Sequence, residues 1–468
     1  MTSDGVHADG PFDVAVVGAG VVGCAVARLL SHHHLRVALV EARNDVGAGT
    51  SKANTAILHT GFDAVPGSVE ARLVARGYEL LRAYAPGAGI AVEDTGAVLV
   101  AWDDEQAANL PKLHAKAAQN GYTAAQVIDA ATVRELEPHL GPGVTGGMVV
   151  PGEHIIDPWT TPIAFATDAV LNGCDLYTGF AVASCELGAE TTVLHSDDGR
   201  AVAARHVVNA AGLHGDTLHR LFGFDGFTVR PRRGELIVFD KLARSLLSRT
   251  ILPVPTSHTK GVLVAPTVFG NVMLGPTADD IDDKGATGST RAGLDGLLDK
   301  GRRIMPGLVG EEVTAVYAGL RAATEHSDYQ LSAHTDARYV CLGGIRSTGL
   351  TASMALAEEA LSLLQSIGLR AKAKDADQVL HASLTPLGEA GPRPYQSGGT
   401  VLCHCERVTG EEIDAAVRAV VPARDLDGLR RRTRAVAGRC QGFYCHAEVC
   451  ARAASASGRS MGEWMGLP

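Results

Sequence analysis

Hydrophobic and polar positions in the first part of the chain follow the order strand, turn, helix, strand. An apolar run at residues 14–17 precedes Gly18-Ala19-Gly20-Val21-Val22-Gly23, and a longer apolar run at residues 21–30 follows. A second short apolar run, residues 37–40, ends on Glu41. Short apolar runs bounded by turn residues are typical of buried strands, and ten residues suffice for a helix. The pattern therefore predicts a strand–helix–strand unit.

The rest of the chain alternates between helical and strand-like segments. Helical patterns occur at residues 69–84, 105–120, 290–304 and 351–366, and Asp157-Pro158 predicts the start of a helix that reaches residue 171. Strand patterns occur at residues 181–187, 192–196, 201–209, 235–239, 261–265, 271–274, 313–320 and 339–342. This alternation predicts an α/β fold. Residues 369–399 shift to Lys, Asp, Pro and Gly, which predicts a linker before a small separate domain at 400–468.

Length and composition narrow the class of protein. A chain of 468 residues suggests two or three domains, and 46% apolar with 20% charged residues is typical of a soluble globular protein. The net charge of −10 does not favour nucleic acid as a partner. Residues 1–11 lack the apolar core of a signal peptide, and no run of about 18 apolar residues predicts a membrane span. We therefore expect a cytoplasmic protein, with peripheral contact to the inner face of the membrane left open.

The glycine-rich turn has the spacing of a dinucleotide site. Gly18 allows the tight turn, Gly20 lets a diphosphate approach the backbone, and Gly23 lets the helix pack on the strand. The N–H groups at the helix N-terminus would face the diphosphate. Glu41 can accept hydrogen bonds from a ribose hydroxyl. Residues 44–59, rich in Gly, Ser, Thr and Asn, can wrap the cofactor; we call them the cofactor loop.

Two later stretches extend this predicted site. A strand at 207–209 ends in small residues that include Ala211 and Gly212, which would let the backbone close over a bound dinucleotide. Residues 343–351 again follow a strand and open a helix, and their N–H groups together with Arg346 could face the electron-rich end of a flavin ring. Taken alone, the stretch at 207–212 is better explained by a strand-to-helix turn that requires glycine.

Five of the nine cysteines lie close to the C-terminal end of the sequence. Cys403 and Cys405 form one pair, and Cys440 and Cys445 follow after 34 intervening residues. Clustered thiolates without a secretory signal indicate a metal site before disulfides, and four thiolates suit an iron cluster or a zinc ion. Zinc sites prefer CxxC pairs, whereas these pairs are CxC and CxxxxC. We do not expect Cys450 to be a ligand, because four are already present.

Taken together, residues 12–368 resemble the D-amino-acid oxidase superfamily of FAD enzymes, in the branch of glycerol-3-phosphate and L-2-hydroxyglutarate dehydrogenases. The resemblance rests on residues 51–61, 66–68, 231–235, 275–278, 318–321 and 349–351. It implies FAD rather than NAD, a Rossmann-like FAD-binding part at about 12–60, 150–225 and 335–368, and an interleaved α+β substrate part at about 61–149 and 226–334. The residues it implies as FAD contacts are Gly18, Gly20, Gly23, Glu41, Arg43, Ser51, Asn54, Val182, Ala211, Gly212, Gly344, Arg346, Gly349, Leu350 and Thr351.

Three further residues are predicted to handle the substrate. Oxidation of a C–H beside a hydroxyl requires a base, and the resemblance places His59 beside the flavin. Arg321 ends a strand and can bind a carboxylate or phosphate through two parallel hydrogen bonds, and Lys260 is a second candidate anchor. Lys52-Ala53-Asn54 and Leu58-His59-Thr60 depart from the family pattern and leave the substrate open. The arginines at 430–432 and 434 are predicted to form a solvated face or to dock an acidic partner.

Residues 401–452 resemble the bacterioferritin-associated-ferredoxin-like [2Fe-2S] domain, a small and mostly helical unit. All four ligand positions match, with zinc as the alternative. A flavin beside such a cluster favours a dehydrogenase that passes single electrons to a protein or quinone, and it disfavours an oxidase. We expect an FAD-dependent dehydrogenase of a small anion, most of all glycerol 3-phosphate, alone or in a hetero-oligomer. The alternatives are an L-2-hydroxy acid, an amino acid or secondary amine, and an electron-transfer subunit without its own reaction.

Overall fold

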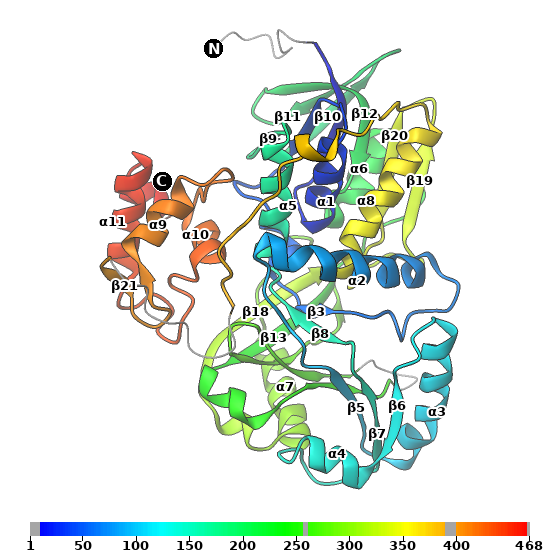
Figure 1. The fold of residues 1–468 in the computed structure, drawn as a ribbon, viewed down its shortest axis with the longest axis vertical. Coiled ribbons are helices and arrows are strands. Elements are labelled where there is room, and N and C mark those ends of the chain that lie inside the picture. Colours follow the sequence, from blue (N-terminus) through cyan, green and yellow to red (C-terminus); the bar gives the residue numbers. More distant parts are fainter. Residues whose placement is uncertain (1–9, 256–260, 389–398, 466–468) are drawn as a thin grey trace.

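The computed structural model describes residues 10–255, 261–388 and 399–465, which form two interleaved sheet regions and a small helical domain (Figure 1). The α/β fold and the helical terminal domain predicted from the sequence are both present. Among the helices in the described ranges, none combines the length and the apolar character needed to cross a bilayer.

The first region is built on an eight-stranded sheet whose central strands are parallel. The order is β10-β11-β12-β1-β2-β9, with β20 beside β12 and β19 beside β20. The strands are β1 (Phe12–Val17), β2 (Val37–Val40), β9 (Asp175–Tyr177), β10 (Val182–Leu187), β11 (Thr192–Ser196), β12 (Ala201–Asn209), β19 (Gln330–His334) and β20 (Tyr339–Gly343). Because helices cover both faces, the central strands are apolar at residues 14–17, 37–40 and 207–208, which explains the short unbroken runs in the sequence.

Helices on this sheet account for the longest apolar segments. They are α1 (Val21–Ser31), α2 (Val69–Ala88), α5 (Thr160–Leu171), α6 (Gly215–Leu221) and α8 (Gly349–Ser366). The predicted boundaries placed α2 and β19 in the substrate part, but α2 packs on α8 and β19 pairs with β20. The start predicted for α5 at Asp157-Pro158 was two residues early. Asp157 still accepts hydrogen bonds from the N–H groups of Trp159 and Thr160.

The second region contains a nine-stranded mixed sheet, drawn in the lower half of Figure 1. Its strands are β5 (Ala97–Ala101), β6 (Gln126–Asp129), β7 (Gly146–Val150), β13 (Arg232–Phe239), β14 (Thr250–Pro253), β15 (Leu263–Pro266), β16 (Val272–Gly275), β17 (Asp279–Asp280) and β18 (Val313–Arg321). Its helices are α3 (Asp104–Gln119), α4 (Ala130–Leu136) and α7 (Arg291–Ile304).

A three-stranded sheet connects the two regions. Its strands are β3 (Ile57–Leu58), β8 (His154–Ile156) and β4 (Val92–Glu93), and β8 lies in the centre. Leu58 pairs with His154 across the antiparallel β3–β8 ladder. This register brings the end of the cofactor loop beside residues 153–154, almost a hundred positions later in the chain.

The terminal domain consists of four helices and a short hairpin around its own core. The elements are β21 (Val401–Cys403), β22 (Val408–Thr409), α9 (Gly410–Val417), α10 (Leu426–Thr433), α11 (His446–Ser457) and α12 (Met461–Trp464). Its core includes the completely covered Trp464. Contrary to the predicted solvated face, Arg431 is buried against Asp45 of the FAD-binding region, and Arg434 is buried over the ring of Phe269 in the second region. Their charges are paired with carboxylates, which is how buried arginine is accommodated.

Candidate functional site

The glycines of the first turn leave room only for backbone. Gly18 has φ +102, and a Cβ there would lie 2.5 Å from the Ala210 carbonyl oxygen; a Cβ at Gly23 would lie 1.8 Å from the Gly18 carbonyl oxygen. Any side chain at either position would therefore force β1, α1 and the end of β12 apart. The three strand ends that carry the predicted FAD contacts adjoin, because β20, β12 and β1 are parallel neighbours. This edge is where doubly wound sheets bind nucleotides.

The N-terminus of α1 meets the cofactor loop. The Val21 N–H donates to Ser51 Oγ at 2.9 Å, and a Cβ at Gly20 would lie 3.3 Å from the same oxygen. First-turn N–H groups have no acceptor within a helix, so this end carries partial positive charge. The hydroxyl of Ser51, the small Gly20 and the helix end together fit a diphosphate.

Glu41 lies beside the glycine turn, and its predicted contact with a ribose stays a prediction. Its carboxylate accepts hydrogen bonds from the N–H groups of Ala19, at 2.7 Å, and Arg43, at 2.9 Å. Burial raises the pKa of Glu41, although these N–H groups oppose the shift. The two bonds orient the carboxylate toward the glycine turn.

The remaining predicted FAD contacts have defined places. Asn54 donates to the Ser51 carbonyl and accepts from the Ala56 N–H, which fixes the cofactor loop. Val182 opens β10, Ala211 and Gly212 follow β12, and Gly344, at φ +66, follows β20; Gly349, Leu350 and Thr351 form the first turn of α8. The guanidinium of Arg346 is bound by Glu70, at 3.2 Å, and by the Ser327 carbonyl, at 2.6 Å. Its predicted role at the flavin ring therefore stays a prediction.

His59 is held by a residue that the sequence analysis missed. The ring atom Nδ1 of His59 lies 2.9 Å from Glu153 Oε2, and the backbone N–H of His59 donates to Thr351 Oγ1 at 3.0 Å. Glu153 is completely buried, and its other oxygen accepts from the N–H and the hydroxyl of Thr60. Where the Glu153 carboxylate is ionised it can only accept, and Nδ1 is then the atom that donates to it while Nε2 carries the lone pair. That tautomer suits a base.

Arg321 ends β18 beside the cofactor loop. Thr50 Oγ1 donates to the Leu320 carbonyl at 2.9 Å, and Tyr317 OH donates to the Asn54 carbonyl at 2.8 Å. Gly234 leaves space for the guanidinium, since a Cβ there would lie 3.0 Å from Arg321 Nη2. Burial, and then the charge of Arg232, lower the pKa of Arg321. Within the described residues no carboxylate forms an ion pair with Arg321. Lys260 lies outside the described residues.

The four predicted cluster ligands come together in two pairs. Cys405 and Cys440 share a thiol hydrogen bond, and Cys403 and Cys445 share another. Burial opposes ionisation of Cys440, but hydrogen bonds from the Tyr444 N–H, from Cys405 and from two further N–H groups lower its pKa. Cys440 therefore favours the thiolate form that iron requires, whereas burial raises the pKa of Cys405 and of Cys445. Cys450 lies buried in α11, outside these pairs.

The arrangement of the thiols fits two metal ions better than one. Around a single zinc ion the sulfurs lie about 2.3 Å from the metal and about 3.8 Å from one another. No three of these four thiols have sulfur atoms that all lie within 4.8 Å of one another. In the part of the chain that the structure describes, the only three possible metal ligands that meet this distance are His32, Asp168 and His381. In a [2Fe-2S] cluster, each iron takes one pair.

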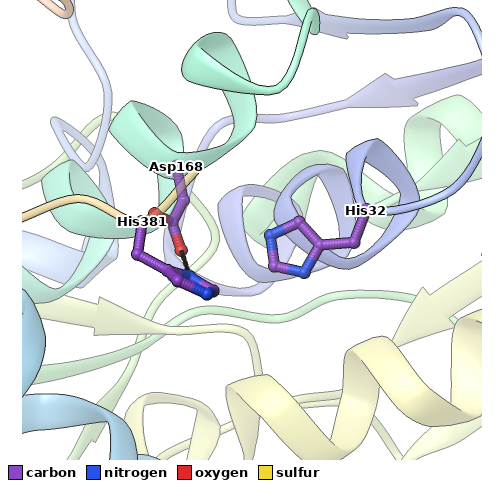
Figure 2. A group of neighbouring side chains, drawn as sticks. All are labelled: His32, Asp168 and His381. Carbon is purple, nitrogen blue, oxygen red and sulfur yellow. Dashed lines mark ion pairs between the residues drawn. The ribbon is translucent and has the colours of Figure 1, made fainter. Parts of the chain in front are cut away.

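The group of His32, Asp168 and His381 has a structural explanation (Figure 2). The Asp168 carboxylate is buried and already binds Arg28 Nε at 2.6 Å, Tyr84 OH at 3.0 Å and the Ala382 N–H. Arg28 supplies the positive charge that the carboxylate needs. Burial, and then Arg28, lower the pKa of His32 to about 4. His381 and Ala382 belong to the predicted linker, so this group attaches the linker to α5.

Comparisons with known proteins agree with both sites. The family described as FAD dependent oxidoreductase matches residues 13–363, and the BFD-like [2Fe-2S] binding domain matches residues 401–451. A glycerol 3-phosphate dehydrogenase of Caloramator mitchellensis is 33% identical over 94% of this chain and 93% of its own length.

Two further relatives match over a shorter part of the chain. The FAD-bound L-alpha-glycerophosphate oxidase structure from Mycoplasma pneumoniae is 30% identical, with a TM-score of 0.74, over 78% of this chain and 96% of its own. The mitochondrial L-2-hydroxyglutarate dehydrogenase of Bos taurus is 29% identical over 57% of this chain and 61% of its own. The chain thus belongs to the FAD dependent oxidoreductase family and joins to its flavin-binding region a [2Fe-2S] domain.

Proposed function

We propose that this enzyme oxidises glycerol 3-phosphate to dihydroxyacetone phosphate and passes the electrons through FAD and its [2Fe-2S] cluster to a separate acceptor. The observation that carries the proposal is the His59–Glu153 pair at the end of the cofactor loop, with Arg321 beside the same loop. These residues supply a base and an anion-binding cation, which are the two groups that the reaction requires of the protein.

The proposed chemistry removes one proton and one hydride from the substrate. His59 Nε2 takes the proton of the secondary hydroxyl, and the Glu153 carboxylate stabilises the resulting positive charge on the imidazole. Arg321 binds the phosphate and thereby places the adjacent C–H. When bound, FAD supplies the acceptor for the hydride.

The terminal domain favours a dehydrogenase over an oxidase. The relative named a dehydrogenase matches this chain along almost its whole length. The oxidase structure matches only 78% of this chain, and that match already takes up 96% of the oxidase. The oxidase therefore has little sequence left for a second domain. Phe443 and Tyr444, between two cluster ligands, are 82% and 80% exposed, so the acceptor, a protein or a quinone, can approach the cluster there.

An L-2-hydroxy acid is the second candidate substrate, because the bovine relative carries that name and Arg321 can also bind a carboxylate. A dye-reduction screen separates the candidates: purified enzyme is mixed with glycerol 3-phosphate, L-2-hydroxyglutarate, proline or sarcosine. We expect glycerol 3-phosphate to give by far the highest kcat/KM. Preference for L-2-hydroxyglutarate would replace the substrate, and preference for an amine would replace the reaction. No reduction by any of them would favour an electron-transfer subunit.

A further inference from the structure

Helix α10 of the [2Fe-2S] domain contacts the cofactor loop through a buried ion-pair group. Asp45 of the loop is 2% exposed, and its carboxylate binds Arg431 Nη2 at 2.6 Å and Arg432 through both oxygens, at 2.6 and 2.8 Å. Gly428 permits the approach, since a Cβ there would lie 2.4 Å from Asp45 Oδ2. The group thus joins the loop to the helix, although Asp45 and Arg431 lie 386 positions apart in the sequence.

A second contact joins the other end of the same stretch. Lys52 Nζ lies 2.6 Å from Asp427 Oδ2, and that carboxylate also binds Arg431 Nη1 at 2.5 Å. The Lys52 carbonyl accepts from Trp159 Nε1 at 3.1 Å. Trp159 lies against Phe269, and the guanidinium of Arg434 lies 4.0 Å from the Phe269 ring centroid. Residues 45–52 are therefore bound at both ends by the terminal domain.

The opposite side of this stretch belongs to the dinucleotide site. The Gly47 N–H donates to the Ala19 carbonyl at 2.8 Å, inside the glycine turn, and Ser51 Oγ accepts from the first N–H of α1. Within the stretch, the Val46 N–H donates to Asp45 Oδ1. Any movement of Asp45 or Lys52 would consequently move the groups that face the diphosphate.

We propose that helix α10 holds the cofactor loop in its FAD-binding conformation, so that the [2Fe-2S] domain sets how tightly FAD is retained. Removing Asp45 takes away the carboxylate that pairs with Arg432, and removing Arg432 leaves the buried Asp45 carboxylate with Arg431 alone. The loop relieves either loss by opening to water. A loop that opens more often releases FAD faster. Because binding free energies are reciprocal, bound FAD in turn favours the docked domain. The inference depends on FAD binding and is independent of the substrate.

The test measures FAD release from the holoenzyme after dilution, followed by the rise in flavin fluorescence, together with hydrogen exchange of peptides that cover residues 44–54. Arg432→Gln alters the docked helix and Asp45→Asn alters the loop from the other side. Arg452→Gln is the matched control, because Arg452 forms an exposed ion pair with Asp414 within the same domain. Iron content and the visible spectrum of the cluster identify preparations in which the terminal domain is folded.

We expect both Arg432→Gln and Asp45→Asn to release FAD at least ten-fold faster and to exchange faster at residues 44–54, with Arg452→Gln unchanged. Lys52→Met, which removes a half-exposed pair, should give a smaller increase in the same direction. If Arg432→Gln does not retain its cluster, Asp45→Asn and Lys52→Met decide the question. Unchanged FAD release in these two variants, with or without faster exchange, would overturn the proposal.

Discussion

The two redox sites of this enzyme are assembled in different ways. The flavin site collects groups from Gly18 to Thr351 through strand ends, helix starts and one long loop. The cluster site draws its four thiols from two short segments that contact each other within one small domain. The flavin site therefore depends on the packing of the whole α/β region, whereas the cluster site depends on local structure and on the metal itself.

The electrostatics of the two sites differ as well. At the flavin site the buried charges are paired in advance, as Glu153 is with His59 and Thr60. Arg321 is the exception, since burial lowers its pKa and no described carboxylate pairs with it. At the cluster site Cys440 accepts hydrogen bonds from the Cys405 thiol and from backbone N–H groups. In the proposed function the first site binds an anionic substrate through Arg321, and the second is completed by iron.

Loss of one cluster ligand should have the largest effect, because it removes the function of the cluster site and leaves flavin reduction intact. In Cys440→Ser we expect iron content and the electron paramagnetic resonance signal of the reduced cluster to disappear, and reduction of the acceptor to fall to background. With FAD added to saturation, flavin bleaching by substrate should keep its rate, because the groups that carry it lie in the other region. Cys450→Ser, outside the thiol pairs, should behave as the wild type. One tightly bound zinc ion and no sulfide in anaerobically prepared protein would make the domain structural.

Loss of the proposed base should have the opposite pattern. His59→Ala is expected to slow flavin bleaching by about two to four orders of magnitude, the usual contribution of a general base, while the cluster stays intact. Stopped-flow absorbance of the flavin measures this step alone. His139→Ala, at an exposed histidine, is the control. Normal bleaching in an FAD-loaded His59→Ala protein would remove His59 from the mechanism.

The proposed anion contact should have a smaller effect. Arg321→Ala loses a charge-assisted contact of about 3 kcal/mol, which lowers kcat/KM for glycerol 3-phosphate by roughly 10²-fold. Arg232, directly opposite on β13, is exposed and paired with Asp280, so Arg232→Ala should change kcat/KM little. Equal losses in the two variants, measured by steady-state kinetics, would place the substrate anion elsewhere.

The sequence predicted local features well and long-range contacts poorly. The glycine turn, Glu41 and the cysteine pairs could be picked out from the sequence, because the spacing between these residues indicates the kind of site they belong to. Glu153 was missed because it lies 94 positions from His59 and meets it only through the β3–β8 ladder, whose strands are too short to show periodicity. A lone acid between the apolar runs 146–150 and 155–156 was the available signal.

The arginines of α10 illustrate the same limit. A run of three arginines in a polar helix has the pattern of a solvated face, and Asp427, one turn before Arg431, fits that pattern as an ordinary i,i+4 pair. Its partner, Asp45, lies in the cofactor loop, and only docking of the two regions shows that Arg431 is 1% exposed. Burial that arises between domains leaves no periodic pattern in either segment.

The smallest expected effect concerns Glu153 as a positioning residue for His59. Glu153→Gln keeps the shape of the side chain and an oxygen that can accept from Thr60, but it removes the negative charge beside the imidazole. A nearby anion favours protonated histidine, so without it the proton leaves at lower pH. The rise of the flavin-reduction rate with pH should therefore shift toward lower pH. The plateau should fall by roughly ten-fold, because a weaker base accepts the hydroxyl proton less readily.

Stopped-flow measurements across pH distinguish this role from mere support of the fold. A positioning role requires the shifted pH profile and a lower kcat with KM nearly unchanged, since Arg321 still binds the anion. A purely structural role would instead release FAD or raise KM while leaving the pH profile in place. Thr60→Val is the matched control: it removes the hydroxyl that donates to Glu153 at 2.8 Å but keeps the charge, so its pH profile should stay close to that of the wild type.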